Sequence, residues 1–469
     1  MKNLVMVGLA GTNKDFIISV PTLVVYLKQF KEITNNYNIS QLSYRLNASI
    51  KTIIKDINKL NPDIVGFSVY MWNKAKIRKI KKKLNKNMQI IYGGPDITPL
   101  DKDKGNERYV YGEGEEQLYK LLIGKMPPPQ SYDKRPSIYA DDVLDKELKK
   151  PGVRVNFETQ KGCTQKCKYC LYHKNEPVIK YRDINVVIDE VEHVNKHGIT
   201  DIRILDANFF SDYNRACHFF EELNKRNINF NIVIESCPRI VSDRFANAIT
   251  AYIKRGNKVI TSFGIQSTSP EVLKEVNRYR TEETEMKCFK KLSELGLIVK
   301  VDLILGLPYD VKETYLKSLD YVVNMMGMGE HAVGLQILRV LPNTEMVNLV
   351  EKHKLKFKKD YQVYKTKHMS REDMTDCSRK NGIIMRIFSF NDIDNKSGMA
   401  KEFFKTKRRT KKTNLELIQI MQDKFMEYLK DTNSPYVKPT YPKAEMYYYI
   451  KINKDVPAEW INKTLREII

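Results

Sequence analysis

The chain has 469 residues, 42% of them hydrophobic, and a formal net charge of +23. This length predicts two or three domains, each with its own core. No uninterrupted apolar stretch reaches about 18 residues, so a membrane span is not expected. The 7 Cys are too few and too unevenly spaced for a disulfide framework, which favours a reducing, cytoplasmic compartment.

The positive charge would attract phosphates, anionic lipids or an acidic substrate. Because the Lys residues are spread along the whole chain, solvated helix faces explain the charge at least as well. The densest basic run, residues 405–412, could attract RNA or an acidic leader peptide, or could be a solvated loop.

Residues 1–125 alternate between predicted strands and helices, which indicates a doubly wound, Rossmann-like parallel sheet. The strands are Asn3–Leu9, Ile64–Tyr70 and Gln89–Tyr92, and the helices are Thr22–Phe30, Ile50–Lys59 and Lys74–Leu84. Ligands of such sheets bind at the carboxyl ends of the strands. The loops after the strands carry hydroxyls, aromatics and glycines: Thr12, Ser68, Tyr70, Trp72, Gly93, Gly94, Pro95, Gly112, Glu113 and Gly114.

After a linker at 126–150, residues 151–346 form a second alternating series. Its strands are Val155–Thr159, Ile202–Asp206, Phe230–Glu235, Val259–Ile265, Val299–Leu305 and Gly334–Val340, and helices such as Ile184–His197, Tyr213–Arg226 and Thr314–Met326 lie between them. Six such units predict a partial (β/α)6 barrel with its chemistry at the C-terminal strand ends. Residues 347–469 are expected to form a small α-rich domain, with an amphipathic helix at Asn414–Leu429.

Three thiols, Cys163, Cys167 and Cys170, are spaced to converge from one tight loop onto one inorganic centre. Random placement of the Cys would give this spacing with a probability of roughly 0.002. A cubane iron-sulfur cluster normally takes four thiolates, so a set of three leaves one iron open to another ligand. The alternative is a structural zinc ion with His173 as its fourth ligand.

This loop, with Tyr169 before its third Cys, resembles the signature of the radical S-adenosylmethionine (SAM) enzymes. The resemblance implies that the three thiolates hold a [4Fe-4S] cluster. The open iron would chelate SAM, and one electron from a reductant of the flavodoxin or ferredoxin type would cleave SAM to a 5′-deoxyadenosyl radical.

The strand ends of the second series resemble the SAM-binding positions of the same family. The implied SAM contacts are Tyr169, Asp206, Asn208, Glu235, Ser236, Gln266 and Arg278. Asp206 and Asn208 offer oxygens to the SAM ammonium group, and Arg278 could fork onto its carboxylate. Turn or helix-cap chemistry explains any single one of these residues equally well.

The first series, ahead of the Cys loop, resembles the cobalamin-binding domain of the cobalamin-dependent branch of this family. Since no His precedes His173, the resemblance implies cobalamin bound base-off, without a His below cobalt. Trp72 or its neighbours would cover that face, although a core aromatic is the alternative for Trp72. In the family, the C-terminal part usually covers the substrate.

The implied function is a methyltransferase that moves a methyl group from methylcobalamin to an unactivated carbon of a small molecule or peptide. Cyclisation or rearrangement with the same cofactors is the alternative, followed by a non-catalytic cobalamin sensor or nucleic-acid module. A tRNA methylthiotransferase would need three N-terminal Cys, and none precedes Cys163.

Two further groups of residues have ordinary explanations. His193 and His197 stand four apart but are followed by Gly198, which favours a helix end over a metal site. The remaining thiols are scattered and are expected to be ordinary buried ones: Cys217, Cys237, Cys288 and Cys377.

Overall fold

A computed structural model describes residues 1–12, 15, 17–139, 144–149, 152–172, 178–238, 240–389, 397–431 and 457–469. The chain forms two compact units. Unit 1 comprises Met1–Thr164, Cys170–Glu235 and Asn247–Lys258, and unit 2 comprises Gln165–Tyr169, Ser236–Ala246 and Val259–Ile469. This division runs through the second strand series, so the domain limits at 125, 150 and 346 stay predictions.

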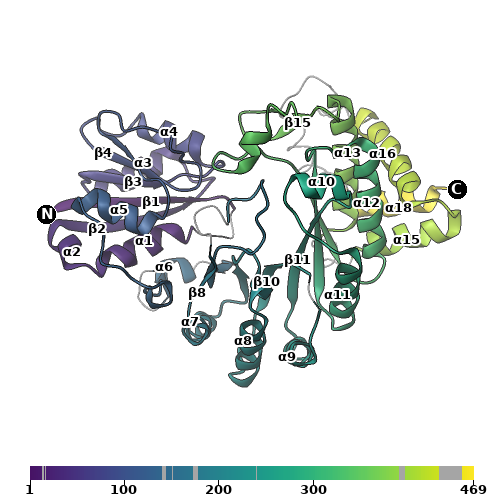
Figure 1. Ribbon diagram of the computed structural model, residues 1–469, viewed down its shortest axis with the longest axis horizontal. Coiled ribbons are helices and arrows are strands. Elements are labelled where there is room, and N and C mark those ends of the chain that lie inside the picture. Colours follow the sequence, from purple (N-terminus) through teal and green to yellow (C-terminus); the bar gives the residue numbers. More distant parts are fainter. Residues whose placement is uncertain are drawn as a thin grey trace. The chain divides into compact units, whose positions relative to one another are not determined.

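The first sheet of unit 1 is parallel and five-stranded (Figure 1). Its order is β2-β1-β3-β4-β5, with β1 at Lys2–Ala10, β2 at Tyr37–Arg45, β3 at Ile64–Ser68, β4 at Gln89–Gly93 and β5 at Glu107–Tyr109. Helices cover both faces, which explains why the last seven residues of β1 are all buried. The predicted doubly wound sheet is confirmed.

Successive residues of β1 enter two separate cores, as the period of two along a strand requires. Leu4 and Met6 pack with helices α1 (Ser19–Lys28) and α5 (Gly114–Ile123). Val5 and Val7 pack with α3 (Ile50–Lys59) and α4 (Lys74–Lys81) on the other side. A short helix, α2 (Lys31–Asn36), leads into β2. Packed apolar cores on both faces of the sheet therefore hold the strands whose carboxyl ends form this edge.

The second sheet is six-stranded, in the order β13-β12-β11-β10-β9-β6. Its strands are β6 (Val155–Phe157), β9 (Asp201–Ile204), β10 (Asn231–Ser236), β11 (Val259–Gln266), β12 (Ile298–Leu305) and β13 (Ala332–Ile337). The helices between them are α7 (Ile184–Lys196), α8 (Tyr213–Lys225), α9 (Asp243–Lys254), α10 (Pro270–Glu275), α11 (Glu282–Glu294) and α12 (Lys312–Met326). Four of its strand pairs are parallel in the described residues: β6 with β9, β9 with β10, β11 with β12 and β12 with β13. The alternating α/β series predicted for this part is confirmed.

Burial alternates strictly along β12. Val299, Val301 and Leu303 are fully buried, whereas Lys300 and Asp302 are partly exposed and form an ion pair at 2.7 Å. One face of the strand therefore packs against helices, and the other face carries the polar groups Lys300 and Asp302. In an ordinary (β/α) barrel, bulky apolar side chains fill the interior.

Shorter elements connect these parts. They are η1 (Tyr132–Lys134), α6 (Asp145–Leu148), the antiparallel pair β7 (Gln160–Lys161) and β8 (Lys180–Tyr181), η2 (Phe209–Ser211), η3 (Glu345–Leu349) and the antiparallel pair β14 (Lys356–Phe357) and β15 (Val363–Lys365). The chain continues through α13 (Arg371–Ile387), α15 (Met399–Thr410), α16 (Asn414–Asp431) and α18 (Ala458–Glu467). The predicted amphipathic helix is α16.

The loop alternative for the basic run 405–412 is wrong. Helix α15 continues to Thr410, and its Phe403 and Thr406 are buried. Three basic residues in its last turn face the negative end of the helix dipole, which is a favourable position for cations.

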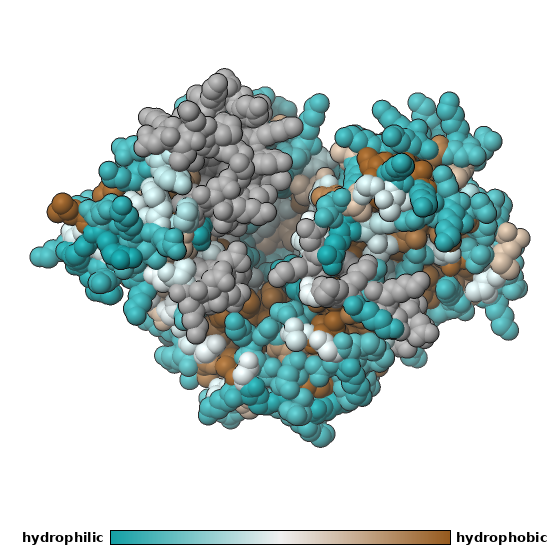
Figure 2. All heavy atoms as spheres, turned by 180° about the vertical axis from the view of Figure 1, so that it is seen from behind, coloured by the Kyte–Doolittle hydropathy of each residue, from teal (hydrophilic) through white to brown (hydrophobic). Residues whose placement is uncertain are grey.

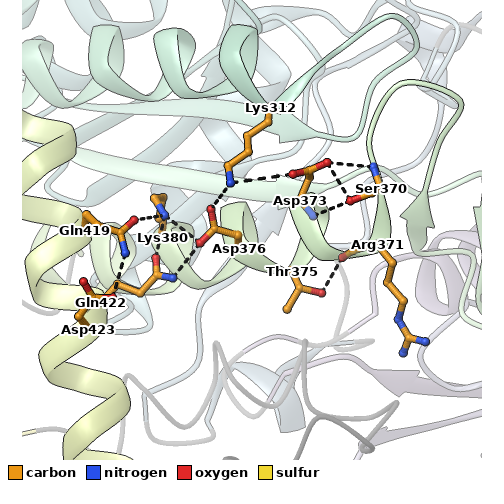
Figure 3. A network of polar contacts seen from close by, with 10 residues as sticks. All are labelled: Lys312, Ser370, Arg371, Asp373, Thr375, Asp376, Lys380, Gln419, Gln422 and Asp423. Carbon is orange, nitrogen blue, oxygen red and sulfur yellow. Dashed lines mark hydrogen bonds and ion pairs between the residues drawn. The ribbon is translucent and has the colours of Figure 1, made fainter.

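A buried polar network joins α12, α13 and α16 (Figure 3). The Lys380 ammonium, on a residue 4% exposed, donates to Asp376 at 2.9 Å, Gln419 at 2.7 Å and Gln422 at 3.0 Å. Asp376 also pairs with Lys312 at 2.9 Å. Because all three ammonium protons find acceptors, the network fixes how these helices pack.

Among the residues drawn in colour in Figure 2, hydrophilic ones predominate, in keeping with the charge of the chain. Among the described helices, none has both the length and the apolar character needed to cross a membrane.

Candidate functional site

The three cysteines of the predicted cluster loop are largely shielded. Cys163 is 8% exposed, Cys167 is 3% exposed and Cys170 is half-buried. The seven Cys all lie within the described residues, and none forms a disulfide. Gly162, just before the first thiol, has a φ of 85°, a left-handed turn that glycine adopts without strain.

The middle of this loop, Gln165–Tyr169, belongs to unit 2 and is held there by backbone hydrogen bonds. The Lys168 N–H donates to the Val276 carbonyl at 3.0 Å, and the Lys168 carbonyl accepts from the Met346 N–H at 2.9 Å. The side-chain amide of Asn277 donates to the Lys166 carbonyl at 3.0 Å. Hydrogen bonds within the protein therefore fix the backbone of residues 166–168, and this backbone conformation does not depend on bonds made by the cysteine sulfurs.

Arg278 follows directly and lies against the cluster loop. Its guanidinium donates to the Cys167 sulfur at 3.7 Å, to the Cys237 sulfur at 3.9 Å and to the Gly264 carbonyl. Burial lowers the pKa of Arg278, but the nearby Tyr169, Cys237 and Cys167 groups more than offset it, so the side chain stays charged.

A set of three thiolates from one loop fits an iron-sulfur cluster with one open iron. Zinc would draw its ligands to within about 2.3 Å of one point, whereas a cubane takes each thiolate on a different iron. Among the described residues, no three Cys, His, Asp or Glu side chains converge on one ion. His173, the alternative fourth zinc ligand, lies outside the described residues.

Asp206 supports the segment that leads into the cluster loop. Its carboxylate is fully buried and accepts from the Thr159 N–H at 2.7 Å, the Gln160 N–H at 3.0 Å and the Thr159 hydroxyl. Burial raises the pKa of Asp206 to about 6 despite these hydrogen bonds. The Asp206 oxygens are thus enclosed by the protein, and their contact with the SAM ammonium group stays a prediction.

Glu235 and Ser236 are neighbours on β10 and face opposite sides of the sheet. Ser236 is 5% exposed, and its hydroxyl lies 2.7 Å from the Thr261 hydroxyl. Glu235 is partly exposed, so its side chain is the more accessible of the two, and contact of either residue with SAM stays a prediction.

Two other predicted SAM contacts have marked backbone features. Gln266 has a φ of 69° beside a β-bulge between Gly264 and Gln266, and its Oε1 is buried without a hydrogen-bond partner among the described residues. Asn208 is 4% exposed, and its carbonyl accepts from the Gln160 side chain at 3.2 Å. An orphaned buried oxygen is the kind of group that a ligand would satisfy, so Gln266 is the better candidate.

The corrinoid candidates gather at the strand ends of the first sheet. The Tyr70 and Trp72 rings stack with centroids 4.4 Å apart, and the Trp72 indole N–H donates to the Leu9 carbonyl at 3.3 Å. Trp72 is 44% exposed, so it is not a core residue. The pair presents a flat, partly exposed aromatic surface.

The glycines of this edge serve different purposes. Gly94 has a φ of 111°, and a Cβ there would lie 2.6 Å from the Val69 carbonyl oxygen, so the backbone itself requires glycine. Gly112 has a φ of 90°, and a Cβ there would meet no atom of the described residues within 4 Å. Open space at Gly112 suits close approach of a bulky ligand.

Three of the predicted corrinoid contacts have partners within the protein. Thr12 donates to Asp15 at 2.7 Å, and the Ser68 hydroxyl lies 2.9 Å from that of Ser19. Glu113 pairs with Lys161 at 2.6 Å, two residues before Cys163. Asp15, Ser19 and Lys161 were not foreseen, because only the fold brings them to these positions.

Asn73 is a further unforeseen residue of this edge. It is fully buried, and its side-chain amide donates to the Leu9 and Ser68 carbonyls at 3.2 Å and 3.0 Å. Its side-chain oxygen accepts from the Tyr70 N–H at 2.9 Å. Asn73 therefore holds the ends of β1 and β3 together; an Asn directly after an aromatic strand-end loop was the available signal.

The paired His193 and His197 close α7 as predicted. His197 caps the helix, and its Nδ1 lies 3.0 Å from the His193 carbonyl oxygen. The two His residues thus lie at the C-terminal end of α7, where the His197 ring contacts a backbone carbonyl of the last turn.

Two family descriptions match the chain. "B12 binding domain" matches residues 21–122 and "Radical SAM superfamily" matches residues 157–322. The first range runs from within α1 to α5, and the second from the end of β6 into α12. A radical SAM domain implies a [4Fe-4S] cluster with SAM, and a B12-binding domain implies cobalamin.

Curated relatives are distant. The chain is 23% identical over 374 residues to the cobalamin-dependent radical SAM methyltransferase TokK of Streptomyces tokunonensis, covering 69% of this chain and 53% of TokK. It is 24% identical over 298 residues to an uncharacterized methyltransferase of Pyrococcus horikoshii, covering 56% of this chain and 64% of that protein. The chain thus spans less than two thirds of the length of these relatives.

Solved structures share the fold. The cobalamin-dependent S-adenosylmethionine radical enzyme OxsB superposes with a TM-score of 0.66 at 14% identity, covering 99% of this chain and 79% of OxsB. The radical SAM methyltransferase TsrM of Kitasatospora setae gives a TM-score of 0.56 at 17% identity, covering 75% and 76%. Residues 21–122 thus match a B12-binding domain and residues 157–322 a radical SAM domain, and the chain shares its fold with the cobalamin-dependent S-adenosylmethionine radical enzyme OxsB.

Proposed function

We propose that this chain is a methyltransferase that transfers a methyl group from cobalamin to an unactivated carbon of a small molecule or peptide. The observation that carries the proposal is the clamped loop of Cys163, Cys167 and Cys170 in a chain that also has a B12-binding domain. Its likeness to TokK, a cobalamin-dependent radical SAM methyltransferase, supports methyl transfer over other outcomes.

When bound, the cluster, SAM and cobalamin would supply one-electron cleavage of SAM and transfer of its methyl group. The chain holds and orients these groups. Cys163, Cys167 and Cys170 would bind the cluster, and the buried, unpartnered Oε1 of Gln266 would accept a donor of SAM. Glu235 is the second SAM candidate, because its side chain is partly exposed at the end of β10.

On the first sheet, Trp72 and Tyr70 would pack against the corrin ring, and the loop at Gly112 would admit it closely. A His below cobalt is not part of the proposal, since no His precedes His173 in the sequence. An external one-electron reductant is the expected partner.

Several curated matches are methylthiotransferases, such as the putative methylthiotransferase of Methanocaldococcus jannaschii, 25% identical over 277 residues. The absence of any Cys before Cys163 argues against a second cluster in the first domain. We therefore keep methylation as the proposed reaction.

The test is anaerobic reconstitution with iron, sulfide and cobalamin, followed by incubation with SAM and a strong reductant. Formation of both 5′-deoxyadenosine and S-adenosylhomocysteine is expected, because SAM would be used as radical source and as methyl donor. A variant with Cys163, Cys167 and Cys170 changed to Ala is the control and should form no 5′-deoxyadenosine. Cobalamin binding without 5′-deoxyadenosine from the native chain would favour a sensor, and 5′-deoxyadenosine alone would favour cyclisation or rearrangement.

A further inference from the structure

One charged side chain lies directly against a predicted cluster ligand. Helix α10 ends at Glu275, and Asn277 turns the chain with a φ of 53°. This turn carries Arg278 back along the Cys loop, where the Asn277 side chain binds the Lys166 carbonyl at 3.0 Å. The same short segment, residues 277–278, thus binds the backbone of the Cys loop and places a positively charged side chain beside it.

The guanidinium is fixed at several points. One terminal nitrogen lies 3.7 Å from the Cys167 sulfur, and the other lies 3.9 Å from the Cys237 sulfur and donates to the Gly264 carbonyl. A Cβ at position 264 would stand 3.2 Å from that second nitrogen. The same Cβ would overlap the Gln266 side-chain nitrogen, so position 264 has no room for a side chain beside either group.

The electrostatic consequence follows from the charge of a three-thiolate cluster. Reduction adds one negative charge, and a buried cation next to a ligand sulfur stabilises the more negative state. Hydrogen bonds to the sulfurs act in the same direction. A shielded site enlarges the effect, because charges interact more strongly there than in water.

We propose that Arg278 is a positioning residue that raises the reduction potential of the cluster held by Cys163, Cys167 and Cys170, through its hydrogen bond and positive charge at the Cys167 sulfur. The inference rests on the proposed function, because it requires the cluster to be present. It differs from the predicted role of Arg278 at the SAM carboxylate, since it acts before SAM binds.

The test is an anaerobic redox titration of the reconstituted cluster, followed by electron paramagnetic resonance in the absence of SAM. The chains compared are the native one, R278Q and R278K. R278Q should hold as much iron and sulfide as the native chain. At the midpoint potential of the native cluster, the ratio of reduced to oxidised cluster in R278Q should be at least tenfold lower, which corresponds to a fall of about 59 mV in potential for one electron. R278K keeps the charge but cannot span the Cys167 sulfur and the Gly264 carbonyl, so its potential should fall between the two.

Arg280 offers a matched control two residues away. Its guanidinium pairs with Glu285 at 2.8 Å and contacts no described sulfur. R280K should keep the native potential. Should R278Q fail to assemble, R278K is the second variant, because a single ammonium group cannot reach both the Cys167 sulfur and the Gly264 carbonyl; its potential should still lie below the native one.

A native potential in R278Q, or in R278K where R278Q does not assemble, would overturn the inference. Weaker SAM binding together with an unchanged SAM-free potential would do the same, and would assign Arg278 to the SAM carboxylate. Failure of the proposed function looks different: the native chain itself would take up no cluster.

Discussion

The enclosed carboxylate of Asp206 gives a sharp test of how the cluster loop is supported. We consider two uncharged replacements, D206N and D206A. The Asn side-chain oxygen can still accept from the Thr159 and Gln160 N–H groups, whereas Ala leaves both buried donors without an acceptor. An unsatisfied buried donor costs about 1–3 kcal/mol, so D206A should be less stable than D206N by about 2–6 kcal/mol.

The charge of Asp206 adds a pH dependence of known sign. Its pKa in the folded chain, about 6, lies above the ordinary value of 3.8 because burial disfavours the ionised form. The stability of the native chain should therefore fall as the pH rises from about 4 through 6. At pH 8 the ionised group costs roughly 3 kcal/mol, a cost that D206N does not carry.

The assay is urea denaturation at pH 4 and pH 8, followed by circular dichroism, together with calorimetric titration of SAM. D206N should match or exceed the native stability at pH 8 and bind SAM with native affinity. The reasoning would be refuted if D206A were as stable as D206N, or if D206N kept its stability and lost SAM affinity. The second result would support the predicted contact with the SAM ammonium group.

Three further predictions concern packing and the first sheet. K380M should lower the free energy of unfolding by about 3 kcal/mol, because it leaves Asp376, Gln419 and Gln422 without the ammonium group. Burial raises the pKa of Asp376, but its hydrogen bonds with Gln422, Lys312 and Lys380 outweigh that effect and lower the pKa to about 2. In an acid titration the native chain should therefore lose stability below pH 4, and K380M should lose less. G94A should lower the unfolding free energy by about 2–4 kcal/mol through its clash with Val69, whereas G112A, in open space, should lose only about 1–2 kcal/mol; equal losses in thermal denaturation would contradict this. W72A should weaken hydroxocobalamin binding, followed by visible absorbance, and cost only about 1 kcal/mol of stability, since its ring is partly exposed; unchanged binding would remove Trp72 from the proposed site.

The sequence predicted those helices and strands whose apolar residues form a continuous run or recur with a clear period. Strand β1 reads as a continuous apolar run, and the bounds of α3 coincide with the prediction at Ile50–Lys59. Strand β2 was missed although it pairs with β1 along its whole length. Only one of its nine residues is buried, so Tyr37–Arg45 shows neither a continuous run nor a clean alternation.

The site was predictable to the extent that it is local. The spacing of the three Cys lies within one loop, and the sequence shows it directly. Arg278 and Cys167 are 111 positions apart, and no local pattern reports that contact. For Glu235 and Ser236 a signal did exist: adjacent strand residues face opposite sides, so only one could face a ligand.

The central claim is that one clamped loop holds an iron-sulfur cluster with an open iron. The most direct measurement is the metal and sulfide content of the anaerobically purified and reconstituted chain, with Mössbauer spectroscopy to identify the centre. We predict about four iron and four sulfide per chain, lost together when the three loop cysteines are changed to Ala. One tightly bound zinc ion and no iron would contradict the account.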